Sequence, residues 1–179
     1  MVWLLGYIAA IWTMEVANTI GGHRLDDLGI VPRTSVGLRG ILLGPFLHSG
    51  FGHAMSNTVP LAILGSLVAV RGQKVLLRVT CTAALVGGLG IWLFGRQGVH
   101  IGASGVVFGY FGFLLARGWY ERSFGSTIIS VVVLIFYGSM ITGALPFVPG
   151  VSWEGHLLGL ASGVLYARIS RRSRTQCKS

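Results

Sequence analysis

Four polar side chains in the apolar runs of this sequence could together carry out nucleophilic chemistry. Ser104 supplies a hydroxyl, His156 an imidazole, and His53 and Asn57 supply hydrogen-bond donors. A hydroxyl becomes a nucleophile when a neighbouring base takes its proton, and a serine paired with a histidine is the common arrangement. Whether these groups can meet depends on the elements that carry them.

The composition excludes an ordinary soluble domain. Hydrophobic residues make up 53% and charged residues 11% of the 179 residues, whereas a soluble domain has roughly 25% charged residues. The 28 glycines are scattered through apolar runs, which excludes collagen and fits close helix packing in membranes. The net charge of +9 does not indicate a nucleic-acid partner, because no basic patch is interleaved with aromatics. We expect a single membrane domain over residues 1–179.

Stretches without Asp, Glu, Lys or Arg predict an all-α, polytopic membrane protein with six transmembrane helices. A helix needs about 20 apolar residues to cross a bilayer. The first helix lacks the basic N-terminal region of a signal peptide, so we retain it as a span. The predicted helices lie near residues 2–20, 53–70, 77–95, 104–117, 126–145 and 153–169.

Lys and Arg residues predict the orientation, because they are enriched in cytoplasmic loops. We therefore expect a multi-pass protein of the cell membrane with both termini in the cytoplasm, and a basic tail at 170–179 that contacts anionic lipid. On the cytoplasmic side lie Arg71, Lys74, Arg78, Arg117, Arg122, Arg168, Arg171, Arg172, Arg174 and Lys178, against Arg24, Arg33, Arg39 and Arg96 on the other.

Two outer connections differ from simple turns. The stretch from Ile20 to Leu47 is long, carries Asp26 and Asp27, and is expected to form short helices partly in the membrane interface. The link 145–151 contains two prolines and a glycine, which predicts a short non-helical cap.

The predicted orientation places three candidate residues at one depth. The second, fourth and sixth helices begin outside and run inward. At 1.5 Å per residue from the first cytoplasmic charge of each helix, Asn57, Ser104 and His156 lie about 21, 20 and 18 Å from that charge. This layer is roughly 10 Å below the outer surface of a hydrocarbon core about 30 Å thick. His53 lies one turn before Asn57 on the same helical face.

The segment before Ser104 must dip below the membrane surface, because a helix over 104–117 is too short to span. Irregular backbone at this depth requires surrounding protein or a water-filled cavity. Gly102 permits unusual backbone angles, and the helix N-terminus directs free N–H groups and its positive dipole end toward Ser104.

We therefore predict a catalytic dyad of Ser104 and His156. The Ser104 backbone N–H, His53 and Asn57 would form the oxyanion hole, in which each donor contributes roughly 10² to 10³ in rate. Glu154 is two residues from His156 and points to another face of the helix, so no triad is predicted.

Glycine stripes explain how the two helices of the dyad could approach each other. Gly105, Gly109 and Gly112 form one stripe on the fourth helix, and Gly159 and Gly163 form another on the sixth. Small residues at such spacing allow two backbones to pack closely in a membrane.

Three motifs resemble the rhomboid family of intramembrane serine proteases: His48-Ser-Gly-Phe-Gly-His53-Ala-Met-Ser-Asn57, Gly102-Ala-Ser104-Gly105 and His156-Leu-Leu-Gly159-Leu-Ala-Ser-Gly163. The resemblance implies a six-helix bundle that cleaves transmembrane substrates near their outer ends, without metal or nucleotide. The roles it implies for the dyad and the oxyanion hole are those predicted above. The supporting residues are Gly102, Gly105, Phe108, Gly159 and His48.

The sequence also departs from the family pattern. Phe108 stands where a tyrosine often stacks on the catalytic histidine, so the resemblance implies stacking without a hydroxyl. The Trp-Arg pair common in the family's first loop is absent, and Leu38-Arg39 is the nearest equivalent. Glu15 and Asn18, one turn apart, are predicted to form a buried hydrogen-bonded pair that supports this loop.

Two other functions compete with proteolysis. One is a catalytically silent rhomboid-like protein that binds or escorts membrane proteins. The other is a metal or haem protein that uses His48, His53 and His156, which is disfavoured because there is no HExxH motif. We expect no cofactor, and no disulfide between Cys81 and Cys177. Transmembrane substrates and membrane lipids are the expected partners, and the oligomeric state is left open.

Overall fold

The computed structural model is a helical bundle that describes residues 2–147 and 150–175, with side chains described as far as residue 170. Among the described residues the extended pairing is confined to one isolated bridge, between Ile30 and His100. The elements, in chain order, are α1 Val2–Ile20, η1 Arg24–Leu28, η2 Val36–Arg39, α2 Gly40–Leu43, η3 Gly44–Phe46, α3 Phe51–Ala69, α4 Gln73–Thr82, η4 Ala83–Gly87, α5 Gly88–Phe94, α6 Ser104–Glu121, α7 Phe124–Tyr137, η5 Gly138–Ala144 and α8 Trp153–Thr175.

Helices lie at each of the six ranges in which we predicted one. Gln73–Phe94 is a continuous helical stretch that includes the π-helical turn η4, and α7 continues into η5 to give Phe124–Ala144. These two stretches are long and apolar enough to cross a membrane by length and composition. The count of six membrane spans stays a prediction.

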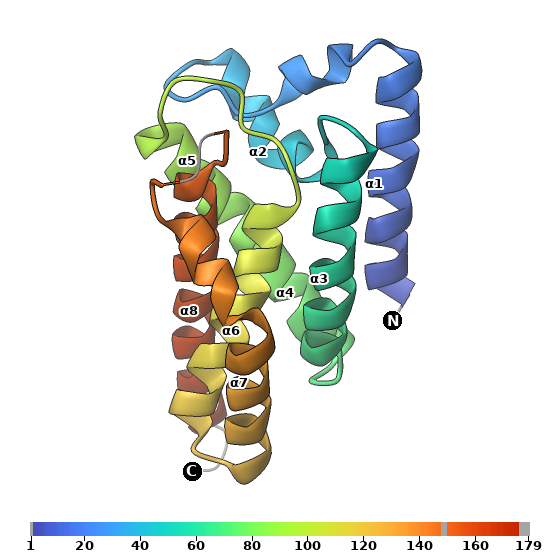
Figure 1. Cartoon of the computed structure of the whole chain (residues 1–179). Coiled ribbons are helices and arrows are strands. Elements are labelled where there is room, and N and C mark those ends of the chain that lie inside the picture. The colour runs from blue at the N-terminus through green and yellow to red at the C-terminus, as the bar shows by residue number, and fades with distance from the viewer. Residues whose placement is uncertain (1, 148–149, 176–179) are drawn as a thin grey trace.

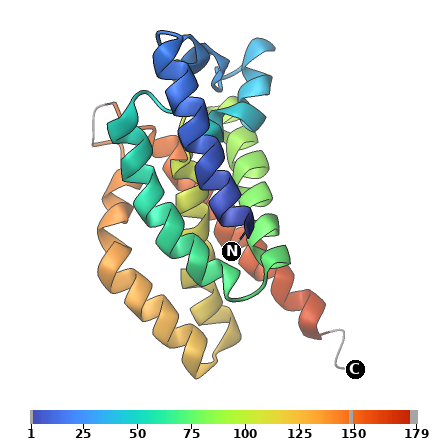
Figure 2. The same ribbon diagram turned by 90° about the vertical axis from the view of Figure 1, so that its right-hand side faces the viewer.

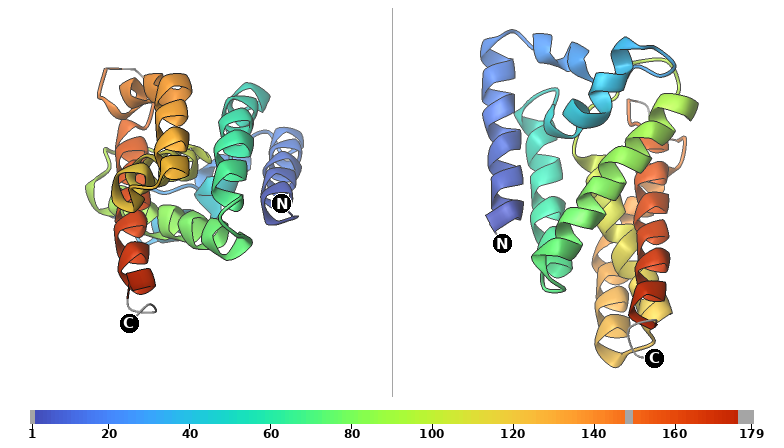
Figure 3. Two further views of the ribbon diagram at one scale, coloured as in Figure 1. Left: turned by 90° about the horizontal axis from the view of Figure 1, so that it is seen from below. Right: turned by 180° about the vertical axis from the view of Figure 1, so that it is seen from behind.

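Helix α6 is the centre of the bundle. It contacts α3, α4, α7 and α8, and most of its side chains are buried, including Tyr110, Phe111 and Phe113. Figure 1 shows α1 and α3 side by side and α7 and α8 flanking α6, and Figure 3 shows α4 and α5 crossing the back of the bundle. The core therefore forms around the helix that begins at Ser104.

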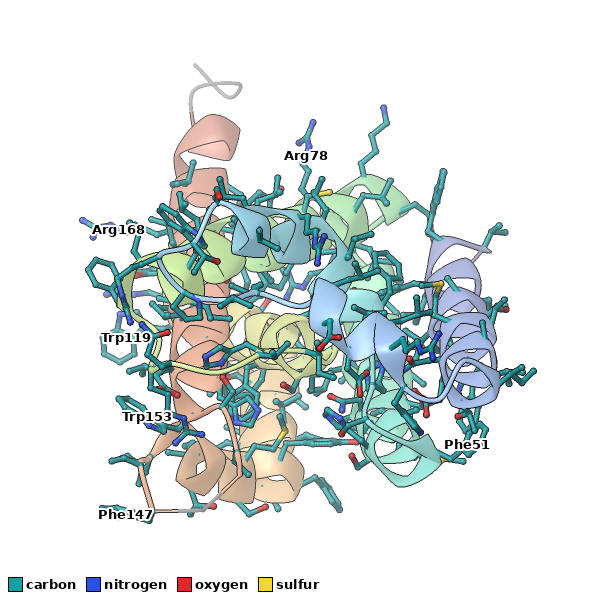
Figure 4. All side chains as sticks on the ribbon, turned by 90° about the horizontal axis from the view of Figure 1, so that it is seen from above. Phe51, Arg78, Trp119, Phe147, Trp153 and Arg168 are labelled. Carbon is teal, nitrogen blue, oxygen red and sulfur yellow. The ribbon has the colours of Figure 1, made fainter. Side chains whose placement is uncertain are left out.

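The outer surface of the bundle is apolar. Large hydrophobic side chains are exposed on α1, α3, α5 and α7, with Phe136 74% exposed. Seen from the end that carries the first loop, Phe51 and Phe147 point outward at the periphery (Figure 4). Contiguous apolar surface of this kind is unfavourable in water and suits contact with lipid.

The connection between α1 and α3 forms short helices, as predicted, and Asn18 anchors it. The Asn18 amide Nδ2 donates to the His48 carbonyl at 3.1 Å and to Asp26 Oδ1 at 2.8 Å, and Asn18 Oδ1 accepts from Leu25 N–H at 3.0 Å. Figure 2 shows this connection capping one end of α1 and α3. One buried amide thus joins the end of α1 to both ends of the loop.

The predicted hydrogen bond between Glu15 and Asn18 is wrong. Both side chains are buried, but Glu15 Oε1 accepts from the hydroxyl of Thr19 at 3.3 Å, and Asn18 bonds to the loop. The loop backbone offers Asn18 both a donor and an acceptor, whereas Glu15 lies one turn further from the loop. Only Asn18 supports the first loop directly.

The cap before α8 is non-helical where it is described. Leu145 is extended at the end of η5, and α8 begins at Trp153. Residues 148–149 of the predicted cap lie outside the described residues. So do the side chains of the predicted lipid-contacting tail from Arg171 to Lys178, and Cys177.

A polar cluster joins the turn after α3 to α6 and α7, at the end of the bundle opposite the first loop. Arg71 Nη1 lies 2.7 Å from Glu121 Oε2 and its Nη2 donates to Ser126 at 3.0 Å, while Glu121 also accepts from Arg117 and Ser126. Burial would raise the pKa of the Glu121 carboxyl, but the hydrogen bonds from Ser126 and Arg71 and the charges of Arg117 and Arg71 outweigh burial and hold this pKa below its ordinary value.

Candidate active site

A cavity of about 740 Å³ opens between α3 on one side and α7 and η5 on the other. It brings together residues from five parts of the chain, including all four predicted to do chemistry. Its lining is Asp26, Ser49, His53, Ser56, Asn57, Pro60, Val99, His100, Ile101, Ser104, Val107, Phe108, Tyr137, Met140, Gly150, Val151, Ser152 and His156.

Ser104 is the first residue of α6, and the loop before it is held by its backbone. Gly102 N–H donates to the Gly44 carbonyl at 2.9 Å, and His100 exchanges both backbone hydrogen bonds with Ile30. Gly102 has a φ of +117°, and a Cβ at this position would lie 2.9 Å from His53 Nε2. A buried loop must pair its backbone groups within the protein, and the first loop provides the partners here.

His156 is fixed in one tautomer by the end of η5. Its Nδ1 lies 2.8 Å from the carbonyl oxygen of Gly143. Because a carbonyl only accepts, Nδ1 carries the proton, which leaves Nε2 as the basic nitrogen. The ring also stacks on Phe108, with centroids 4.2 Å apart and planes at 9°. The stacking that the family resemblance implied at Phe108 is therefore present.

The close approach of α6 and α8 that the glycine stripes predicted is confirmed. A methyl group on Gly159 would overlap the Gly105 carbonyl, and one on Gly163 would overlap the Gly109 carbonyl. A methyl group on Gly105 would instead lie 3.7 Å from the Gly155 carbonyl, an ordinary contact. Backbone therefore touches backbone directly below the start of α6.

His53 and Asn57 lie on the α3 wall of the cavity. The Ser49 backbone N–H donates to His53 Nδ1 at 3.4 Å, so Nε2 carries the proton and is a donor. Asn57 Nδ2 donates one hydrogen to the His53 carbonyl at 2.9 Å, within its own helix. The amide group of Asn57 has a second N–H, and its side chain lines the same cavity as Ser104.

His48 lies behind the cavity wall. Its ring is buried, its Nε2 accepts from the Ala103 backbone N–H at 3.3 Å, and its carbonyl accepts from Asn18. It also contacts His53 edge to face, with centroids 4.9 Å apart. His48 therefore joins the first loop to the residue before Ser104.

Two further polar side chains, His100 in the cavity wall and Glu154 beside His156 in the chain, bond to partners other than Ser104 and His156. His100 Nδ1 bonds to the Ser152 hydroxyl at 2.7 Å and its Nε2 to the Arg96 carbonyl at 2.9 Å. Glu154 Oε1 accepts from Arg96 N–H at 3.2 Å, so this carboxylate does not orient His156.

Three groups at the site were not predicted from the sequence: the Gly143 carbonyl, Ser49 and Asp26. A backbone carbonyl leaves no signal in residue identity, so Gly143 was not predictable from type or spacing. Asp26 was visible as a charge in the first loop, but its distance along the chain from Ser104 gave no reason to place it at the cavity.

The chain belongs to the rhomboid family: the family model for the Rhomboid domain matches residues 37–173. Among similar proteins, the uncharacterized protein Rv1337 of Mycobacterium tuberculosis is 39% identical over 175 residues, covering 93% of this chain and 73% of the relative. The uncharacterized protein ML1171 of Mycobacterium leprae is 38% identical over 176 residues, covering 93% and 69%. RHOMBOID-like protein 4 of Arabidopsis thaliana is 28% identical over 153 residues, covering 83% and 37%. This is accordingly a membrane-embedded protein.

Proposed function

We propose that this protein is a serine endopeptidase that hydrolyses peptide bonds in or near transmembrane segments of membrane proteins. The observation that carries the proposal is the fixed tautomer and orientation of the His156 ring. Its Nδ1 is occupied by the Gly143 carbonyl, its ring is held by Phe108, and it shares one cavity with Ser104. A basic Nε2 on a fixed ring is what a serine nucleophile requires of its general base.

In the proposed reaction Ser104 Oγ attacks the scissile carbonyl carbon as its proton passes to His156 Nε2. The carbonyl oxygen becomes an oxyanion, which the Ser104 backbone N–H, His53 Nε2–H and the Asn57 amide stabilise. His156 then gives its proton to the leaving amine, and the C–N bond breaks to leave an acyl-enzyme. Water repeats the sequence on the ester, releases the carboxylate and restores Ser104.

We infer the orientation of the proposed protease in the membrane from the distribution of its Lys and Arg residues. We infer six spans in the cell membrane with both termini cytoplasmic, because Lys and Arg are concentrated on the turns and helix ends opposite the first loop. The cavity then faces the outer leaflet, and transmembrane substrates would enter it from the lipid. The apolar surface of the bundle supports lipids as the other partner.

A serine-directed covalent probe tests this proposal on protein purified in detergent. We expect the wild type to be labelled, and Ser104→Ala and His156→Ala to lose labelling together with cleavage of a panel of single-span substrates, by about 10³-fold or more. Ser56→Ala is the matched control, because Ser56 lines the same cavity and its hydroxyl bonds only to the His53 carbonyl among the described residues. It should keep both signals.

The competing function, a silent binding or escort protein, predicts the opposite result. Absence of labelling and of cleavage in a folded wild type, with retention of a co-purified membrane protein, would favour it.

A further inference from the structure

The cavity that contains Ser104 and His156 receives one acidic side chain from the first loop. Asp26, in η1, lines it together with Ser49 and His53. Apart from Asp26 and three histidines, the described residues of this lining have uncharged side chains, and none of them is Lys or Arg. The charge character of the described cavity wall is therefore set by Asp26.

The Asp26 carboxylate is held in place before any ligand arrives. Oδ1 accepts from the buried amide of Asn18 at 2.8 Å, and the Asp26 backbone is bonded on both sides, to the His23 carbonyl at 3.2 Å and from Gly29 N–H at 3.0 Å. The side chain remains 25% exposed, and His23 Nδ1 lies 3.8 Å from Oδ2. A positioned, accessible carboxylate pays little ordering entropy when it pairs with a cation.

The neighbouring carboxylates lie elsewhere. Asp27 is exposed and is not among the residues of the cavity, and Arg39 donates a hydrogen bond to its backbone carbonyl at 3.1 Å. Glu154 is buried against Arg96. Asp26 and Asp27 thus form a natural pair of adjacent acids, one at the cavity and one away from it.

We propose that Asp26 selects substrates that carry a Lys or Arg on the outer side of the scissile bond, an inference that rests on the proposed function. A chain bound at Ser104 that continues out of the membrane passes the first loop, where Asp26 contributes to the cavity wall. Membrane proteins carry few Lys and Arg residues on their outer side. A basic residue at this position therefore distinguishes a small class of single-span proteins from the rest.

The test uses one cleavable single-span protein in which successive positions on the outer side of the scissile bond are changed to Lys, Met or Glu. Lys and Met have similar length, so their ratio of kcat/KM isolates the charge. For the wild type we expect Lys to exceed Met by about fivefold at the best position, with Glu below Met, as for a partly exposed ion pair. The preference should weaken in high salt.

Variants of the two aspartates identify the source of the preference. Asp26→Asn keeps the shape of the side chain and an oxygen for Asn18, so it should lower kcat/KM for the Lys substrate and bring the Lys to Met ratio to about 1. Asp27→Asn should retain the wild-type ratio.

The inference is overturned if the wild type cleaves all three substrates equally, or if Asp26→Asn slows them all by the same factor, which would mark Asp26 as structural. A wild type that cleaves none of them overturns the proposed function and this inference with it. Cleavage that Ser104→Ala abolishes, without an advantage for Lys, overturns this inference alone.

Discussion

At the scale of single residues, the imidazole of His156 has two nitrogens that the protein places in different states. The Gly143 carbonyl holds the proton on Nδ1, and the ring lies flat against Phe108. Together these contacts fix the tautomer and the tilt of the ring. A base held in this way needs no reorganisation before it accepts a proton.

The stack on Phe108 gives a prediction for the proposed reaction. Aromatic pairs contribute about 0.5–1.5 kcal/mol beyond their buried area. Phe108→Leu should therefore lower kcat by about 3- to 10-fold with little change in KM, because the ring of His156 loses its orientation. Phe108→Tyr, which keeps the stack, should retain most of kcat.

Steady-state kinetics on a cleavable single-span substrate measure both variants. An equal decrease of kcat in the Leu and Tyr variants would contradict a role for the stack. So would a change in KM without a decrease of kcat.

The candidate site residues could be selected from the sequence because of their position in it. Ser104, His53, Asn57 and His156 are polar groups in apolar runs, and the structure brings all four to one cavity. The hydrogen-bond partners of buried polar side chains were harder to predict from the sequence. Asn18 was expected to pair with Glu15, because spacing along one helix was the only guide to a partner. The loop that competes for Asn18 becomes a neighbour only after folding.

At the scale of elements, the contact of α6 with α8 depends on individual glycines, and two of them serve as a matched pair. Gly159→Ala would place a methyl group on the Gly105 carbonyl, so we expect a loss of about 2 kcal/mol or more in the free energy of unfolding, as for other overpacked sites. Gly105→Ala meets only a 3.7 Å contact and should change this free energy by less than about 1 kcal/mol.

Denaturant unfolding in detergent, followed by the fluorescence of the native tryptophans, measures both variants. Similar stabilities for the two would show that the backbone contact does not determine how these helices pack.

Charge-free stretches located helices well because a charged side chain usually ends a membrane span. The helix ends differ from the prediction where a charge lies inside a helix: α6 continues to Glu121 although we ended it at residue 117, and α8 continues to Thr175 although we ended it at residue 169. Arg117 is buried and bonded to Glu121 and Ser170, so it lies within the bundle and does not mark the helix end. The π-helical turn of η4 had no signal in the sequence. It packs beside α8, where Gly87 lies close to Gly159.

At the scale of the whole molecule, the cluster around Glu121 joins α6, α7 and the turn after α3, and it gives a prediction about pH. The folded pKa of Glu121 lies below the ordinary value of 4.5. The stabilisation is therefore fully present above about pH 4.5, where the unfolded carboxyl is ionised, and is lost as the pH falls through the lower folded pKa. At pH 7 we expect Glu121→Gln to be less stable by about 1–2 kcal/mol.

Thermal unfolding of the wild type and of Glu121→Gln across pH 3 to 7 tests this expectation. The gap between their midpoints should narrow as the pH falls below about 4.5 and close below the folded pKa of Glu121, since the folded wild-type carboxyl is then neutral as well. A gap that is constant over this range would assign the loss to packing.

The backbone contact between α6 and α8 has a consequence for redesign. At Gly159 and Gly163 the segment that carries His156 meets main-chain atoms of the segment that carries Ser104, so the separation of the two backbones at these positions depends on the absence of side chains there. For the proposed function, changes of substrate preference are therefore best sought on the other walls of the cavity, in α3, η1 and η5, where side chains can be replaced without entering the contact between α6 and α8.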